Sequence, residues 1–383
     1  MPVINLETIQ GIVKRDGSLF VPEPITEAIG ACIKSNHADL LLEIERLKRI
    51  YASYVQRDEP MVVDYQGQVT IDAYSANYLP RNTLIPKILF LSIVEHPAFR
   101  DIPREVRILD LGSGTGGIVL GFLDLFQKEP LCRTNVKLVC CDASKPSLAH
   151  QMRLLQKLKF ANYEVWHATV DLKSNRSALL RFAPYDFIVI ANLLTELSPE
   201  HIDNLLLSLP DILAKKGLLL IAEAPRLYTT KLTVHASQLL RNGGLNQFYS
   251  CPPGHQCSSE RCYVWLQTSF ECPNVKVGTR LIRVTNTLKT TWVLFCRSKY
   301  SIYDFLCEKY PNLKWGCAAP FGQEFDIEEK MDYQVCTPDK VINITHSRAK
   351  ALVRDKKSVI LRGSIIGFTK DYSKASILWH PLY

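Results

Sequence analysis

The sequence has no long hydrophobic run, and this absence excludes a membrane-spanning helix. A run of about 18 or more apolar residues is needed to cross a bilayer, whereas the apolar stretches here, such as residues 217–222, are short and bounded by charge. Residues 1–7 contain neither a basic segment before an apolar core nor an Arg- and Ser-rich, acid-poor stretch, so they predict no targeting signal. We therefore expect a cytoplasmic protein with no membrane partner; a mitochondrial location would require that a targeting segment has been removed.

Internal repeats and low-complexity tracts are also missing. The 383 residues, 47% of them hydrophobic, suit an ordinary globular protein of two or three domains. The formal net charge is +8 and the pI is near 8.8, which is below the pI above ~9 that is typical of a dedicated nucleic-acid domain. This charge is a modest argument for an RNA partner, and no DNA partner is expected.

Three regions differ in their hydrophobic pattern. Residues 1–100 predict a helical region, in which the apolar stripe between residues 40 and 51 is expected to face a core. Residues 101–300 alternate between strand-length apolar segments and helix-compatible segments, which predicts an α/β domain with a parallel sheet and crossover helices. Residues 301–383 predict a small β-rich module with basic residues, either a barrel or an appended sheet.

The strands of the parallel sheet are expected at residues 106–111, 137–142, 163–168, 185–192 and 217–223. A Cys-, Pro- and Gly-rich insertion at residues 246–275 interrupts the pattern, and residues 279–284 and 290–296 then resemble a final strand pair. Further strands are expected in the C-terminal module at residues 341–344 and 358–368.

A glycine-rich loop follows the first expected strand of the sheet. Residues 108–117 read ILDLGSGTGG, so that Gly112, Gly114 and Gly116 lie between a strand and the helical segment at residues 118–123. Glycines let the backbone turn tightly and approach a ligand where a Cβ atom would clash. The loop therefore predicts a nucleotide-type site.

Two acidic residues distinguish between the ligands that such a loop can hold. Gly112, Gly114 and Gly117 also fit the dinucleotide pattern G-x-G-x-x-G, in which a pyrophosphate lies at the helix N-terminus. Asp110, however, puts a carboxylate at the strand end, where it suits the cationic amino group of S-adenosylmethionine (SAM) and would repel a pyrophosphate. Asp142 ends the next strand, where a carboxylate can accept hydrogen bonds from both ribose hydroxyls.

These residues resemble motif I and the following acidic motif of the class I SAM-dependent methyltransferases. The resemblance implies a Rossmann-like domain in which residues 110–116 hold the methionine part of SAM and Asp142 holds the ribose. Asp171 is expected at the adenine, and Asn192 begins the segment where a methyl acceptor is expected. The predicted cofactor-binding residues are Asp110, Gly112, Ser113, Gly114, Thr115, Gly116, Asp142, Asp171 and Asn192. The alternative is a structural glycine turn in an unrelated α/β domain.

A catalytic signature is missing after the fourth expected strand. Many amino-group methylases have Asn/Asp-Pro-Pro-aromatic there, whereas residues 192–196 of this chain read NLLTE. No catalytic residue is predicted, and a SAM-binding protein without turnover stays open beside an enzyme.

Three of the 12 cysteines are clustered in a polar loop. Cys251, Cys257 and Cys262 lie among Pro, Gly and Ser residues. Disulfides are rare in a reducing compartment, so these clustered thiols favour a metal or iron-sulfur site, whereas cysteines in apolar surroundings fill a core. A closed site needs a fourth ligand. The candidates are Cys272, which is nearest, and Cys336, His255, Cys307 and Cys317.

The order of these features resembles the methyltransferase-like family associated with the small ribosomal subunit of mitochondria and bacteria. In that family, a motif I domain is followed by a Cys-Pro-rich loop, a third Cys, and a distant C-terminal Cys before a turn and a strand. The resemblance spans roughly residues 75–345 and implies that four thiolates hold a four-iron, four-sulfur (4Fe-4S) cluster. These thiolates are those of Cys251, Cys257, Cys262 and Cys336. Zinc suits all-thiolate ligation equally well.

The resemblance implies a SAM-binding, iron-sulfur methyltransferase-like protein that acts on ribosomal RNA or assembles the small ribosomal subunit. The basic residues between 348 and 362 would then contact RNA phosphates. Two other functions stay open: a non-catalytic ribosome assembly factor, and a zinc-stabilised methyltransferase that acts on a small molecule or a protein.

Overall fold

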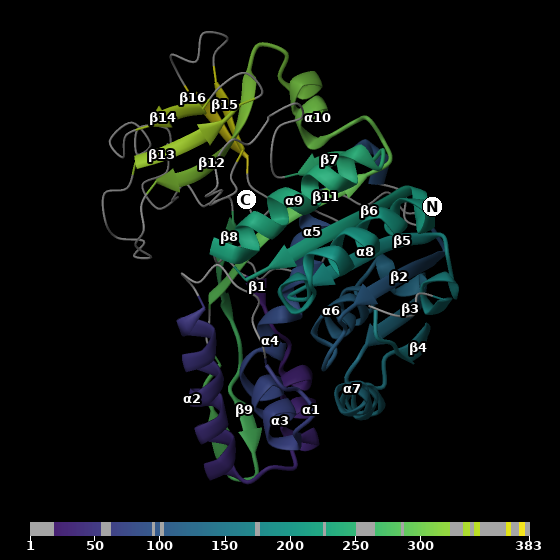
Figure 1. The fold of residues 1–383 in the computed structure, drawn as a ribbon, viewed down its shortest axis with the longest axis vertical. Helices are drawn as coiled ribbons and strands as arrows, with labels where there is room; N and C mark the ends of the chain where they lie inside the picture. Colours follow the sequence, from purple (N-terminus) through teal and green to yellow (C-terminus); the bar gives the residue numbers. More distant parts are fainter. Residues whose placement is uncertain are drawn as a thin grey trace.

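The computed structural model describes twelve stretches of the chain. They are residues 19–54, 63–93, 96–99, 103–172, 177–224, 227–249, 265–284, 287–321, 332–337, 341–344, 365–368 and 375–379. Within these stretches, a nine-stranded sheet lies at the centre, with helices on both of its faces and a separate antiparallel sheet near the C-terminus (Figure 1).

The central sheet is mostly parallel. Its parallel strands lie in the order β4-β3-β2-β5-β6, and β11 then pairs with β6 in the antiparallel direction. On the far side of β11 lies β8, which is followed by the edge strand β1, and β7 also pairs with β11. The strands are β1 (Leu19–Phe20), β2 (Glu105–Leu111), β3 (Asn135–Asp142), β4 (Tyr163–Thr169), β5 (Tyr185–Ala191), β6 (Leu213–Glu223), β7 (Asn246–Tyr249), β8 (Trp265–Glu271) and β11 (Thr287–Cys296).

Helices connect the parallel strands, because neighbouring parallel strands require a crossover. These helices are α6 (Gly117–Leu125), α7 (Lys145–Leu158) and α8 (Pro199–Ile212), and α9 (Leu227–Asn242) follows β6. The predicted mixed α/β fold is confirmed, and this sheet is consistent with a Rossmann-like class I methyltransferase fold.

Both faces of the sheet are buried, which explains why its strands read as continuous apolar runs. Along β2, Ile108 belongs to the core on one face, with residues of α6 and α7, whereas Leu109 and Leu111 belong to the core on the other, with residues of α8 and α9. Side chains alternate along a strand, so Asp110 faces the same side as Ile108.

Five α-helices precede the parallel strands. They are α1 (Glu23–Cys32), α2 (His37–Ser53), α3 (Gln68–Asn77), α4 (Leu79–Asn82) and α5 (Leu84–Ile93) within the described residues. The apolar stripe predicted between residues 40 and 51 is only partly correct. Leu40, Ile44 and Leu47 are buried, whereas Leu41 and Leu42 are 43% and 72% exposed, because one face of a helix carries positions i, i+4 and i+7.

The predicted final strand pair is only partly correct: residues 290–296 lie in β11 of the central sheet, but residues 279–284 do not pair with them. Residues 280–282 form β10 (Arg280–Ile282), which pairs with β9 (Val275–Val277) in a hairpin apart from the central sheet, and this hairpin contacts α1. Gly278 has φ +60 and begins the two-residue turn that reverses the chain. The hairpin therefore pairs residues 275–282 with each other, and β11 pairs with β6, β7 and β8 instead.

The C-terminal strands form an appended antiparallel sheet in the order β14-β13-β12-β15-β16, preceded by α10 (Ile302–Lys309) (Figure 1). Its strands are β12 (Lys314–Phe321), β13 (Asp332–Cys336), β14 (Val341–Ile344), β15 (Ile365–Phe368) and β16 (Ala375–Trp379). The strand expected at residues 341–344 is confirmed, as is the end of the one expected at residues 358–368. None of the helices in the described residues is both long and apolar enough to span a membrane.

Candidate functional site

The glycine-rich loop lies between the carboxyl ends of β2 and β3. The backbone N–H groups of Gly112 and Ser113 both donate to the carbonyl oxygen of Cys141, at 2.9 and 3.0 Å. The next amide, that of Gly114, donates to Oδ2 of Asp142 at 2.7 Å. The loop is therefore fastened to the end of β3 and carries its backbone across the edge of the sheet.

Gly116 ends the loop as the N-cap residue of α6, with φ +97. A Cβ atom at this position would lie 2.6 Å from Cγ of Gln151, which is on α7. Because both the backbone conformation and the close approach exclude a side chain, glycine here allows α6 to start beside α7.

Asp110 is the most unusual ionisable group of the site. The side chain is 1% exposed, and neither carboxylate oxygen has a hydrogen-bond partner among the described residues. Burial raises the pKa of Asp110 to about 7; the nearby Ser113 side chain opposes this shift without making a hydrogen bond of ordinary geometry, and the charge of Asp142 adds slightly to it. A buried carboxylate without a partner is costly, and a cation placed beside it would stabilise the charged form.

Asp142 ends β3 and is held by two backbone amides. Its Oδ2 accepts from Gly114 and its Oδ1 accepts from the N–H of Ser144, both at 2.7 Å. Burial nevertheless raises the pKa of Asp142 above its ordinary value. Each carboxylate oxygen keeps a lone pair beyond its amide bond, so the pair of oxygens can still accept two hydroxyl donors.

A cavity of about 340 Å³ opens in front of this edge, a size within the range of ligand pockets. Most of the predicted cofactor residues line it, namely Gly112, Ser113, Gly114, Thr115, Asp142, Asp171 and Asn192. Asp110 lies buried at the end of β2, and Gly116 is occupied in capping α6. The hydroxyl of Thr115 is buried and, like Asp110, has no hydrogen-bond partner among the described residues.

The loop after β5 forms one wall of the cavity through Asn192, Leu193, Glu196 and Leu197. Glu223, at the end of β6, is 1% exposed, and its Oε1 accepts from the N–H groups of Leu193 and Leu194 at 2.8 Å each. Sequence reasoning missed this role of Glu223, because a single carboxylate at a strand end gives no signal of which loop it holds.

Asn192 turns the chain into that loop with φ +55, an uncommon conformation for a residue other than glycine. Its N–H donates to the carbonyl oxygen of Ala222 at 3.0 Å. The positions of Asn192 and Glu196 at the cavity are therefore set by the neighbouring strand β6.

A further part of the cavity lining comes from the residues before the sheet, which sequence reasoning also missed. We call Tyr65, Tyr74 and Asn82 the aromatic wall; all three line the cavity and are half-buried. Asn82 donates from Nδ2 to the phenol oxygen of Tyr74 at 3.0 Å, and the Ser144 hydroxyl donates to the Tyr65 carbonyl oxygen at 3.0 Å. Ser144 lies two residues after Asp142, the last residue of β3. The bond from Ser144 to Tyr65 therefore ties the aromatic wall to the carboxyl end of β3.

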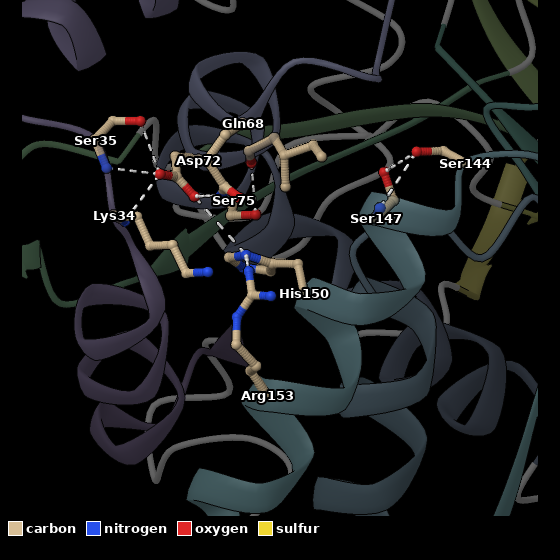
Figure 2. Close-up of polar contacts among 10 residues, drawn as sticks. Lys34, Ser35, Gln68, Asp72, Ser75, Ser144, Ser147, His150 and Arg153 are labelled. Atoms are coloured by element: carbon tan, nitrogen blue, oxygen red, sulfur yellow. Dashed lines mark hydrogen bonds and ion pairs between the residues drawn. The ribbon is translucent and has the colours of Figure 1, made fainter.

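A buried network around Asp72 fixes the helix that carries Tyr74 (Figure 2). Oδ2 of Asp72 accepts from the N–H groups of Lys34 and Ser35 and from the Ser35 hydroxyl, at 2.8 to 2.9 Å, and Oδ1 accepts from Nε2 of Gln68 at 2.7 Å. His150 of α7 approaches the same carboxylate, with Nδ1 3.8 Å from Oδ1. The network joins the end of α1, α3 and α7.

His150 is fully buried in this network, and burial lowers its pKa to about 4. Nη2 of Arg153 lies 3.3 Å from Nδ1 of His150, a contact that fits a neutral imidazole accepting from a guanidinium.

The predicted metal ligands are only partly covered by the structure. Cys251, Cys257 and Cys262 lie outside the described residues. Cys336 ends β13 and is paired in register with Cys317 of β12, so two of the candidate fourth ligands are cross-strand neighbours. Cys272 packs against the apolar core, and its thiol donates to the Pro273 carbonyl oxygen. Among the residues that the structure describes, no group of three or more His, Cys, Asp and Glu is placed to hold a metal ion.

Neither a protein-family model nor a curated protein matches the sequence. Among solved structures, an O-methyltransferase family protein from Burkholderia thailandensis is 11% identical, with 68% of this chain and 70% of that chain covered and a TM-score of 0.39. The magnesium protoporphyrin IX methyltransferase of Synechocystis with bound SAH is 16% identical, with 66% and 93% covered and a TM-score of 0.35. An rRNA methylase from Streptococcus thermophilus is 13% identical, with 56% and 95% covered and a TM-score of 0.31. Identities and TM-scores this low say nothing about the substrate of the present chain.

Proposed function

We propose that this protein binds SAM at the carboxyl edge of β2 and β3 and transfers its methyl group to RNA of the small ribosomal subunit. The observation that carries the SAM site is Asp110, a buried carboxylate without a hydrogen-bond partner among the described residues, at the end of the strand that leads into the glycine loop. The amino group of SAM is a cation of the kind that this carboxylate requires.

The remaining donors and acceptors fit the other parts of SAM. The oxygens of Asp142 suit the two ribose hydroxyls, and we assign Asp171 and Leu172, which also line the cavity, to the adenine. SAM supplies an electrophilic methyl group when bound. The protein's own contribution is to orient the acceptor against it from the loop at residues 192–197 and from the aromatic wall.

The RNA of the small subunit is proposed on the order of the sequence motifs and on the net charge of +8. A 4Fe-4S cluster on Cys251, Cys257, Cys262 and Cys336 belongs to the same proposal. Cys336 stands at the end of a strand of the appended sheet, so thiolates from the loop at residues 251–262 would tie this sheet to the SAM-binding domain.

The SAM site is tested by isothermal titration of the purified full chain with SAM. We expect Asp110→Asn and Asp142→Asn each to weaken binding by at least about tenfold, since each removes a charge-assisted contact. Asp186→Asn is the control: Asp186 is a half-buried aspartate of the central sheet, but it accepts from the Arg107 N–H and does not line the cavity. Wild-type protein that does not bind SAM, or equal binding by all variants, would overturn the proposal.

A non-catalytic assembly factor is the second candidate, and the segment NLLTE at residues 192–196 favours it, because it lacks a recognised catalytic tetrad. The two are separated by incubating small-subunit RNA with protein and methyl-labelled SAM. Label in the RNA supports the enzyme, whereas SAM-dependent RNA binding without label supports the assembly factor.

A further inference from the structure

The cavity is also lined by the aromatic wall, none of whose residues is assigned to SAM. The rings of Tyr65 and Tyr74 lie 5.6 Å apart at 85°, and Tyr74 is stacked on Tyr78 at 5.3 Å. The guanidinium of Arg81 lies 4.3 Å from the Tyr78 ring centroid. Tyr78 therefore braces one face of Tyr74, and the Tyr65 hydroxyl is hydrogen-bonded to that of Tyr51 at 2.8 Å, so both tyrosines that line the cavity are held in fixed orientations.

The phenols of this wall remain neutral. Burial raises the pKa of Tyr74 to about 12 and raises that of Tyr65 well above its ordinary value, and the nearby charge of Glu196 adds to both shifts. Tyr74 accepts from Asn82, which leaves its own O–H free to donate to a ligand. The wall can therefore offer aromatic surface and a hydrogen-bond donor, and it is unsuited to act as a base.

The loop opposite supplies polar groups of a complementary kind. Asn192 and Glu196 line the same cavity, and Asn82, which belongs to the aromatic wall, adds a second carboxamide. Carboxamides and carboxylates are the side chains that pair with the edges of nucleobases: Asn pairs with the N6/N7 edge of adenine and Glu accepts from the amino group of cytosine.

The charge of the cavity limits what can enter. No lysine, arginine or histidine is present among the described residues that line it, whereas Asp142, Asp171 and Glu196 are. These carboxylates disfavour an acceptor that carries a phosphate or carboxylate inside the cavity, because like charges repel. A planar, uncharged ring with hydrogen-bonding edges fits both walls.

We infer that the space between the aromatic wall and residues 192–196 is a subsite for a single nucleobase, turned out of its strand so that its phosphates stay outside the cavity. The base stacks on Tyr74 and contacts the perpendicular ring of Tyr65, and its edge faces Asn82, Asn192 and Glu196. This inference rests on the proposed function in one respect: SAM occupies the neighbouring part of the cavity. It narrows the acceptor from RNA in general to a base atom, and it excludes the ribose and the phosphates.

The test uses full-length protein saturated with S-adenosylhomocysteine, so that a free nucleoside cannot bind in place of the cofactor. Saturation-transfer NMR and titration then measure the binding of adenosine, cytidine, guanosine, uridine and ribose 5-phosphate. We expect at least one nucleoside to bind and ribose 5-phosphate not to bind. Tyr74→Leu should weaken the binding of that nucleoside by about tenfold. Tyr74→Phe should weaken it by less than about threefold, because stacking needs the aromatic ring. Tyr163→Leu, at the amino end of β4, is the matched control.

The affinity for S-adenosylhomocysteine, measured on the same samples, separates the two proposals. If the wild-type protein does not bind S-adenosylhomocysteine, the proposed SAM site is wrong. The nucleobase subsite is wrong if this affinity is intact but nucleosides do not bind, or bind equally to wild type and Tyr74→Leu. It is also wrong if an added arginine-containing peptide displaces the bound nucleoside. Should Tyr74→Leu fail to fold, Glu196→Ala replaces it. That exposed loop residue should then change which nucleoside binds best, and an unchanged order of the four would count against the subsite.

Discussion

At the scale of single residues, Asp110 makes the affinity for SAM depend on pH. With a pKa of about 7, the empty site is half protonated at neutral pH, whereas an ammonium ligand requires the carboxylate. Below pH 7 the affinity should therefore fall, by about tenfold per pH unit at the limit. Above about pH 8 it should fall again, because an α-amino group loses its proton there.

Titrations of SAM at pH 6, 7, 7.5 and 9 measure this profile. Asp110→Asn should bind weakly and should lose the decline on the acid side. An affinity that is the same at pH 6 and pH 7.5 would show that Asp110 does not face the amino group.

The same residue should destabilise the empty protein. A carboxyl group whose folded pKa is above its unfolded value of 3.8 favours folding when it is protonated and opposes folding once it is charged. Asp110→Asn removes that charge, so at pH 8 the variant should melt at least about 2 °C above the wild type. The difference should shrink as the pH falls through 7, because the wild-type group then takes up its proton. Thermal melts at pH 8 and pH 5.5 decide this, and a variant less stable than the wild type at pH 8 would contradict it.

At the scale of elements, a buried ion pair joins α5 to α6. Nζ of Lys87 lies 2.8 Å from Oδ2 of Asp124 and also donates to the Phe20 carbonyl oxygen, and the two side chains are only 1% and 7% exposed. Asp124→Ala would leave the ammonium buried without its counter-charge. We expect a loss of about 3 kcal/mol or more in the free energy of unfolding by urea.

The control for this variant is Glu105→Ala, which breaks pairs with Lys137 and Arg107 at the surface, where the three side chains are 26% to 37% exposed. Its effect should stay below about 1 kcal/mol. Equal effects of the two substitutions would mean that burial of the Lys87 pair is unimportant.

The network between α1, α3 and α7 predicts a sensitivity to acid. Burial holds the folded pKa of His150 at about 4, below the ordinary 6.5, so the unfolded chain takes up a proton before the folded one does. Stability should therefore fall as the pH drops from about 6.5 to 4, by at most about 1.4 kcal/mol per pH unit from this group. Asp72, Arg153 and Lys34 are the charged groups that face the imidazole.

Urea unfolding at pH 7, 5.5 and 4.5 measures this slope, and His150→Asn should make it shallower while lowering stability at pH 7. A slope identical to that of the wild type would assign the acid sensitivity to other groups.

At the scale of the whole molecule, the parts of the site that are local in sequence could be predicted and the parts assembled by packing could not. The glycine loop with Asp110, and Asp142 one strand later, are read directly, because in an alternating α/β chain each strand end comes to the same edge. Tyr65, Tyr74 and Asn82 carry no such signal. They reach the cavity only because Asp72 anchors α3 and because Ser144 holds the backbone at Tyr65. The β9–β10 hairpin was misread for a related reason, since strand length alone does not give the pairing partner.

The last prediction concerns the link between the appended sheet and the rest of the chain. If Cys336 completes a 4Fe-4S cluster with the loop at residues 251–262, protein purified without air should be brown and contain about four irons. Cys336→Ser should lose them and should also lower the melting temperature, because the cluster no longer joins distant segments. Cys272→Ser should keep the iron, since this thiol packs in the apolar core and donates to Pro273. Metal analysis and visible absorption of the wild type, Cys336→Ser and Cys272→Ser test this prediction. A colourless protein with one zinc, or metal loss with Cys272→Ser alone, would instead support the zinc-stabilised methyltransferase.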